Sequence, residues 1–176
     1  MRDRQAAQQA RRAREFQAFV AGAAGRLLHA ATLLTGERPD ANPRARALLT
    51  AALASTYASW DRLRGEDPYD RTRTALVVRF ARGAWRRSRG RGGLLARLSP
   101  QERLVVVLRL YEGVAEEQTA ALLGLAVERV RVLCARAVAA VLHPPRGPAP
   151  GVSGLPGVHA APGGHPGAPL GKAASP

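Results

Sequence analysis

The chain has little of what catalysis and metal binding require. Its single cysteine, Cys134, can form neither an internal disulfide bond nor a cysteine-based zinc site. Its four histidines are scattered, and none has the carboxylate or thiol neighbours that acid-base or metal chemistry needs. A Gly-rich phosphate loop followed by lysine is also missing. We therefore expect no enzymatic activity, no cofactor and no bound metal.

Long hydrophobic runs are missing as well. The N-terminus, MRDRQAAQQARRAREF, has no apolar segment of the signal-peptide type. No later stretch approaches the roughly 18 apolar residues that are needed to span a bilayer. The expected location is the reducing cytoplasm, without membrane insertion.

Acidic residues are few compared with basic ones. The chain has 13 Asp and Glu against 27 Lys and Arg, a formal net charge of +14, and Lys172 is its single lysine. Such a basic chain favours nucleic acid as a partner, ahead of an acidic membrane surface or an acidic protein. Coding bias in a high-GC genome explains the same composition, so the placement of the arginines has to decide.

Helical periodicity recurs along the chain, and no strand pattern stands out. Apolar residues recur every three or four positions from Phe16 to Leu34 and stop at Gly36, a predicted C-terminal cap. A third helix is predicted over roughly residues 72–88. The second helix, which lies between them, carries a stripe formed by Leu49, Leu53, Tyr57, Trp60 and Leu63.

These patterns predict an all-α fold of two small helical domains. In residues 144–176, Pro and Gly contribute 9 and 8 of the 33 residues, a composition that cannot offset the entropy of ordering. The ten residues of the linker span at most roughly 35 Å. The predicted division is a frayed basic arm over 1–13, a helical domain over 14–87, a flexible Gly and Arg linker over 88–97, a helix-turn-helix domain over 98–143 and a disordered tail over 144–176.

The second domain opens on a strong helix start. Ser99 stands at the N-cap, Pro100 at the first helical position and Glu102 three residues after the cap. This order predicts a capping box with the favoured proline placement. The helix is expected to continue through LVVVLRLYE to Gly113.

The residues that follow have the spacing of a helix-turn-helix. Ala120 supplies the small residue where two helices cross, Gly124 the tight turn, and Val130 the apolar residue early in the second helix. Leu123 and Leu125 complete a small core. An αα-hairpin that contacts no DNA is the competing interpretation.

The last helix places an apolar run where a DNA-reading helix is usually polar. On a helical projection Cys134, Ala137 and Val141 lie within roughly 40° of Val130, with Leu133 just beyond, so these residues are expected in the core. Val132 is the anomalous member of the opposite, outward arc. That arc comprises Glu128, Arg129, Arg131, Val132, Ala135 and Arg136.

The third helix carries an aligned cationic row. Its arginines, at positions 71, 79, 82, 86 and 89, fall within roughly 80° of one another, with Trp85 at the edge. Such a row suits a nucleic-acid strand, because arginines meet phosphates and the ring can stack on an unpaired base. A solvated face on an amphipathic helix, with Trp85 half-buried, is an equally good interpretation.

With these motifs the chain resembles the extracytoplasmic-function sigma factors of the sigma-70 family, in particular the actinobacterial group related to SigE. LSPQERLVVVLRLYEGVAEEQTAALLGLAVERVRVLCARAVAAVL is similar to sigma domain four, which reads the minus-thirty-five promoter element. EFQAFV, LLHAATLLTG and YASWDRLRGEDP resemble sigma domain two, which binds the polymerase clamp and melts the minus-ten element. The resemblance implies a sigma factor that directs transcription initiation. Its expected partners are core RNA polymerase and promoter DNA, with an anti-sigma factor as a further candidate.

The resemblance also implies site residues. The minus-thirty-five reader falls on Glu128, Arg129, Arg131, Val132 and Arg136. The minus-ten face falls on Arg71, Arg79, Arg82, Trp85, Arg86 and Arg87. The polymerase-binding surface falls on Arg46, Leu49, Leu53, Tyr57 and Trp60.

Three departures from the family pattern stand out. Residues 46–50 read RALLT, where the family carries an acidic pair on the polymerase-binding helix, so charge-assisted contacts to a basic clamp helix are lost. The connection between the two domains is shorter than usual. Ala115 replaces the serine that caps the first helix of the helix-turn-helix, at a cost on the order of 1 kcal/mol.

Two other functions remain open. A degenerate paralogue could bind DNA as a helix-turn-helix regulator, or as a sigma-like adaptor, without initiating transcription. A basic helical module could instead bind an acidic protein partner.

Overall fold

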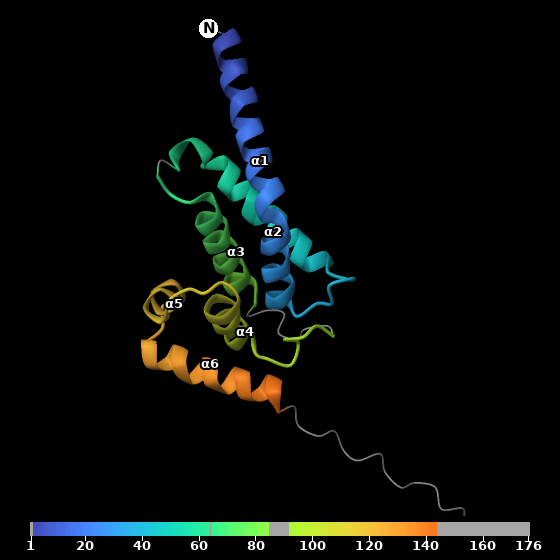
Figure 1. Cartoon of the computed structure of the whole chain (residues 1–176), viewed down its shortest axis with the longest axis vertical. Coiled ribbons are helices and arrows are strands. Elements are labelled where there is room, and N and C mark those ends of the chain that lie inside the picture. Colours follow the sequence, from blue (N-terminus) through green and yellow to red (C-terminus); the bar gives the residue numbers. More distant parts are fainter. Residues whose placement is uncertain (1, 64, 85–91, 144–176) are drawn as a thin grey trace, which may run out of the picture. The chain divides into compact units, whose positions relative to one another are not determined.

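The computed structural model describes residues 2–63, 65–84 and 92–143 (Figure 1). The all-α prediction is confirmed, because these residues form helices and two isolated β-bridges but no strand. The predicted tail lies outside the described residues. The elements are α1 (Arg2–Thr35), α2 (Pro43–Ala58), the short 3-10 helix η1 (Trp60–Arg62), α3 (Pro68–Ala84), α4 (Pro100–Val106), the π-helix η2 (Val107–Tyr111), α5 (Glu116–Leu123) and α6 (Val127–Leu142).

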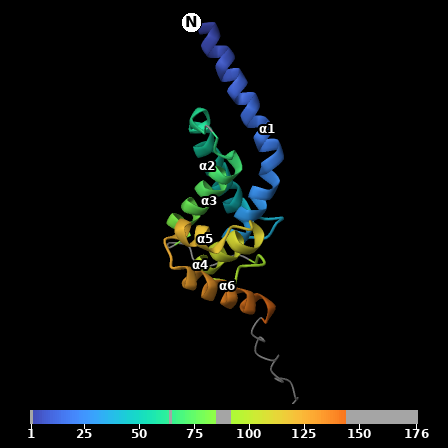
Figure 2. The same ribbon diagram turned by 60° about the vertical axis from the view of Figure 1, so that its left-hand side comes forward.

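Helix α1 ends where the sequence predicts and begins earlier. Gly36 has a φ of 64°, and the N–H of Glu37 donates to the carbonyl oxygen of Thr32 at 3.3 Å, which confirms a glycine C-cap. Residues 2–13, expected to be frayed, are helical instead. Alanine, glutamine and arginine dominate this segment, and all three have favourable helix propensities. Its first turns extend beyond the other helices (Figure 2). The side chains of residues 2–11 are exposed.

One side chain fastens this N-terminal half of α1. The Arg12 guanidinium contacts the Asp61 carboxylate at 3.0 Å and donates to the carbonyl oxygen of Tyr57. It also lies over the Tyr57 ring, 4.4 Å from the ring centroid. These contacts hold α1 against the end of α2. They help to explain why the helix begins before Phe16, where its apolar stripe starts.

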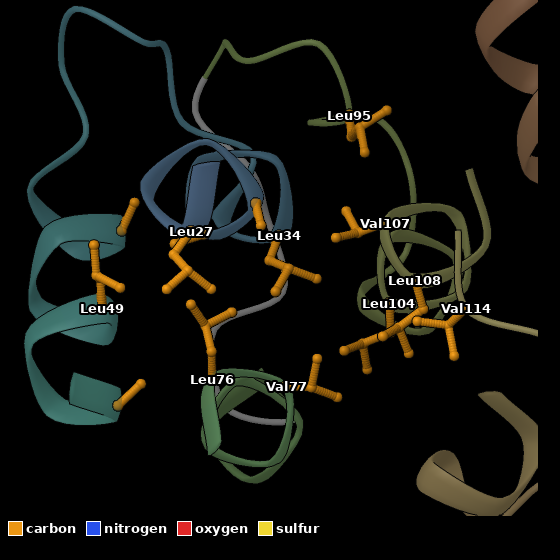
Figure 3. Close-up of a cluster of buried hydrophobic side chains, with 14 of the residues drawn as sticks. Leu27, Leu34, Leu49, Leu76, Val77, Leu95, Leu104, Val107, Leu108 and Val114 are labelled. Atoms are coloured by element: carbon orange, nitrogen blue, oxygen red, sulfur yellow. The ribbon is translucent and has the colours of Figure 1, made fainter. Parts of the chain in front are cut away.

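The hydrophobic core draws on helices from both predicted domains. Leu27 and Leu34 of α1 and Leu76 of α3 are almost completely buried. They belong to one cluster with Leu104 of α4 and Leu108 of η2, and their side chains converge in Figure 3. Contacts between helices accordingly place the described residues in one packed unit. The boundaries of the two domains stay a prediction.

Two polar contacts join the end of α1 to the segment around α4. The N–H of Gly93 donates to the carbonyl oxygen of Gly36 at 3.1 Å, and a Cβ at Gly93 would lie 2.2 Å from the Glu37 carbonyl oxygen. Arg103 is buried and donates to the carbonyl oxygens of Leu34 at 2.9 Å and Leu98 at 3.0 Å. Burial lowers the pKa of Arg103. At the first of these contacts the two backbones lie so close that a Cβ at position 93 would collide with the Glu37 carbonyl oxygen, so this position requires glycine.

A buried carboxylate makes a third connection. Glu112 follows η2, and its side chain is 1% exposed. The Tyr69 hydroxyl of α3 donates to its two carboxylate oxygens at 3.0 Å. Arg26 of α1 and Arg73 of α3 lie 3.5 and 3.9 Å from the same carboxylate. Burial, together with the Glu112 charge, raises the pKa of Tyr69. Glu112 thus holds three helical elements together.

Helix α1 is long and apolar enough, by length and composition alone, to cross a membrane. From the sequence we expect no stretch long and apolar enough to span a bilayer, and α1 departs from that expectation. Leu27 and Leu34 of this helix are fully buried against α2, α3 and α4, and a core helix meets the same length and composition criteria. The finding is therefore weak evidence for a membrane span.

Candidate nucleic-acid interface

The helix that supports the site begins with the predicted capping box. The N–H of Glu102 donates to Ser99 Oγ at 3.3 Å, and the N–H of Ser99 donates to Glu102 Oε2 at 2.8 Å. Pro100 occupies the first helical position. Two N–H groups that lack helical partners are satisfied in this way. The prediction from the Ser-Pro-Gln-Glu order is confirmed.

The end of this helix differs from the prediction. Instead of continuing as an α-helix, residues 107–111 form a π turn, with the N–H of Glu112 donating to the Val107 carbonyl oxygen at 2.9 Å. Gly113 then has a φ of 69°, and Val114 N–H donates to the Leu108 carbonyl oxygen at 2.9 Å. The wider turn directs Glu112 toward α1 and α3. No local sequence signal marks a π turn.

The helix-turn-helix has the predicted geometry. Ala120 of α5 and Val130 of α6 are buried together in a small cluster, and Leu125 packs against it. Gly124 adopts a φ of 65° at the end of α5, and the N–H of Leu125 donates to the Ala120 carbonyl oxygen at 2.9 Å. The roles predicted for Ala120, Gly124 and Val130 are confirmed. The start of α5, at Ala115, has no side-chain cap.

Helix α6 separates the core from solvent as its projection predicts. Val130, Leu133 and Ala137 are buried, and Cys134 is half-buried. Burial raises the pKa of the Cys134 thiol, so it behaves as a small apolar side chain. Val132 is 56% exposed. The whole predicted outward arc is exposed, namely Glu128, Arg129, Arg131, Val132, Ala135 and Arg136.

Two of the arginines on this face are ion-paired. Arg131 Nε lies 2.7 Å from Glu116 Oε2, and Glu116 Oε1 lies 3.6 Å from Arg109. Arg136 Nε lies 2.7 Å from Oε1 of Glu102. Sequence reasoning missed both carboxylates, because the partners are 15 and 34 residues apart and no helical spacing relates them.

The predicted minus-ten face is described in part. Arg71, Arg79 and Arg82 are exposed on α3. Arg73, which was not predicted as a site residue, is half-buried and contacts Asp70 at 3.0 Å and Glu112 at 3.9 Å. The remaining predicted residues lie outside the described residues, namely Trp85, Arg86 and Arg87, and their role stays a prediction.

The residues predicted to bind polymerase differ in exposure, because Leu49 is buried, Leu53 and Trp60 are half-buried, and Arg46 and Tyr57 are exposed. Their role stays a prediction. Leu49 is buried, and Leu53 is half-buried against the same cluster. Tyr57 and Trp60 pack on Phe16, with ring centroids 4.9 and 5.2 Å from that of Phe16. Arg46 is exposed and donates to Asn42 Oδ1 at 3.0 Å. The stripe on α2 thus serves the core and an aromatic cluster, while Arg46 faces outward.

A cavity of about 530 Å³ lies between α3, α4 and α5, with Val77, Leu104 and Leu123 in its mainly apolar lining. Within the described ranges, no group of three or more His, Cys, Asp or Glu side chains is placed to hold a metal ion. The outward arc of α6 is the candidate binding site, because it is exposed, rich in arginine and lies on the second helix of the helix-turn-helix.

Comparisons with known proteins agree with this geometry. Residues 94–141 match the family described as Sigma-70, region 4. Searches of curated proteins and of solved structures found no match. The matched range contains the capping box, α5, the turn at Gly124 and all but the last residue of α6. The chain therefore contains a sigma-70 region 4 helix-turn-helix domain.

Proposed function

We propose that this chain is an RNA polymerase sigma factor of the extracytoplasmic-function type, which binds core RNA polymerase in the cytoplasm and directs it to promoters. The observation that carries the proposal is α6. Within a region 4 helix-turn-helix, its core-facing residues are buried and its outward arc is exposed and rich in arginine. The second helix of such a motif is the one that enters the major groove.

The outward arc supplies groups of the kind that read base edges. The proposed reader of the minus-thirty-five element comprises Glu128, Arg129, Arg131, Val132 and Arg136. Arginine can form paired hydrogen bonds to guanine, and an exposed valine can pack on a thymine methyl group. Val132 then acts as an apolar contact flanked by cationic ones.

The proposed minus-ten face lies on α3. Arg71, Arg79 and Arg82 are exposed there and can meet DNA phosphates. Trp85, Arg86 and Arg87 complete this face in the family resemblance. An anti-sigma factor as partner likewise rests on the resemblance alone.

The test is association with core polymerase followed by transcription. The purified full-length chain should co-elute with core RNA polymerase, and the complex should initiate transcription from a subset of genomic promoter fragments. Failure to bind core polymerase at micromolar concentration would contradict the proposal. Arg129→Ala should weaken promoter binding by about 1–3 kcal/mol if this side chain reads a base. Arg2→Ala, which removes the same charge at the far end of the described chain, serves as the matched control.

A second candidate function has an observation in its favour. Leu49, Leu53 and Trp60 pack against other parts of the chain, so α2 offers less free surface to a polymerase than the resemblance implies. A helix-turn-helix regulator would bind duplex DNA without polymerase, and its affinity would fall steeply with salt. Salt-sensitive duplex binding with no polymerase association would favour this alternative.

A further inference from the structure

Two carboxylates stand behind the reading face of α6, each from a different helix. Glu116 of α5 contacts Arg131 at 2.7 Å, and Glu102 of α4 contacts Arg136 at 2.7 Å. The arginine side chains are 58% and 65% exposed, whereas those of Glu116 and Glu102 are 25% and 9% exposed. The carboxylates are thus the inner members of both pairs, and the guanidinium groups face outward.

Both carboxylates are themselves held in place. Glu102 accepts the Ser99 N–H with its second oxygen, as part of the capping box. Glu116 lies 3.6 Å from Arg109, which in turn donates to the carbonyl oxygen of Val114. A carboxylate with two partners loses the freedom to follow a moving arginine. Each glutamate is therefore a fixed point to which an arginine of the reading face is attached.

The geometry of the pairs leaves part of each guanidinium available. In both cases the carboxylate engages Nε. A guanidinium has five N–H donors, so the terminal nitrogens remain able to bind a base edge. At the same time the negative charge of the glutamate repels a DNA phosphate and so opposes its approach to the paired arginine.

We propose that Glu116 and Glu102 are positioning residues of the reading face, which hold Arg131 and Arg136 toward base edges and suppress their sequence-independent binding to phosphates. The proposal rests on DNA binding by α6 as put forward above. Arg129, on the same arc, has no ion pair within the described part of the chain. Its guanidinium is held by no carboxylate of the described residues and is free to bind either a base edge or a phosphate, whereas Arg131 and Arg136 are held toward base edges.

The experiment measures binding of the full-length chain to a random-sequence duplex of about 30 base pairs at several salt concentrations. Each additional phosphate contact steepens the plot of log affinity against log salt by about 0.9. Glu116→Gln should steepen the slope by about that amount and raise the affinity several-fold. Glu117→Gln is the matched control, because it removes the same charge from the next residue of α5. The Glu117 side chain is exposed, forms no ion pair among the described residues and acts on Arg131 only through its charge, without the direct contact that Glu116 makes.

Two further variants locate the effect. Glu102→Gln should act in the same direction through Arg136, and a glutamine at this position is compatible with the capping box. In an Arg131→Ala background, Glu116→Gln should no longer change the slope, since the double-mutant cycle isolates the pair. Thermal unfolding of each variant shows that the fold is retained.

The outcomes separate the two proposals. If the wild type binds duplex DNA and Glu116→Gln behaves like Glu117→Gln, the positioning role is wrong while the proposed function stands. An effect of Glu116→Gln that persists in the Arg131→Ala background also overturns it. Absence of duplex binding by the wild type, alone and with core polymerase, overturns both. The positioning role makes a further demand. The ratio of the affinity for duplexes selected by the wild type to the affinity for random duplex should be lower for Glu116→Gln than for the wild type.

Discussion

Replacing Glu112 by glutamine should destabilise the packed helices while leaving their shapes unchanged. The carboxylate is nearly inaccessible to solvent and accepts a hydrogen bond from Tyr69 while facing Arg26 and Arg73. Glutamine has a similar volume but carries no charge and has one oxygen instead of two. The substitution therefore tests the charge of Glu112 separately from its packing.

The expected loss follows from these contacts. A hydrogen bond to a charged group contributes about 1.5–3 kcal/mol, and glutamine keeps a neutral version of it. The ion pairs are long, at 3.5 and 3.9 Å, and Arg26 is half exposed, so they add no more than about 1 kcal/mol. We expect Glu112→Gln to lower the free energy of unfolding by about 2 kcal/mol.

Urea unfolding followed by circular dichroism measures this change. With a slope of about 1–3 kcal/mol per molar urea, the midpoint should fall by roughly 1 M. Tyr69→Phe removes the donor, and the double variant should lose less than the sum of the single losses, with a coupling of about 1 kcal/mol. Glu117→Gln, at an exposed position, is the control. A midpoint for Glu112→Gln equal to that of Glu117→Gln would refute the structural role of the buried charge.

Three further predictions concern the helix-turn-helix. Ala115→Ser should raise the free energy of unfolding by about 1 kcal/mol in thermal melts, because it supplies the missing N-cap. Gly124→Ala should lower it by about 1 kcal/mol, because its φ of 65° disfavours a Cβ although no atom obstructs one. Burial raises the pKa of Glu102, but hydrogen bonds from Ser99 and Arg136 outweigh it and the pKa is lowered. The stability that Glu102 adds is therefore present at neutral pH and lost on acidification below its ordinary pKa of about 4.3. The difference in the free energy of unfolding between wild type and Glu102→Gln should therefore disappear at that low pH. A difference that stays constant from pH 7 to pH 3 would argue against a stabilising charge on Glu102.

Local sequence patterns predicted those features that depend on neighbouring residues. The capping box at Ser99 and the left-handed turn at Gly124 involve residues within a few positions of each other, where backbone geometry leaves few alternatives. The outward arc of α6 followed from a period of 3.6 residues per turn in the same way. The region 4 match lies over this part of the chain.

Contacts between distant residues were beyond the reach of these patterns. The resemblance implies that Leu49 and Leu53 of α2 bind polymerase, which stays a prediction. The structure packs both side chains against the core cluster, a contact that an amphipathic period alone does not reveal. Likewise, the extension of α1 to Arg2 depends in part on Arg12, whose partners Tyr57 and Asp61 are 45 and 49 residues away.

By itself the sequence determined that the protein is helical, that α1 ends at Gly36 and α5 at Gly124, and which side of α6 faces outward, because hydrogen bonds and side-chain periods within a helix are local. Only the tertiary structure decided which partner each of the buried or half-buried carboxylates has. It placed Glu116 beside Arg131, Glu102 beside Arg136 and Glu112 beside Tyr69, pairs separated by 15, 34 and 43 residues. Coulombic attraction acts through space, so only the fold could bring these groups together.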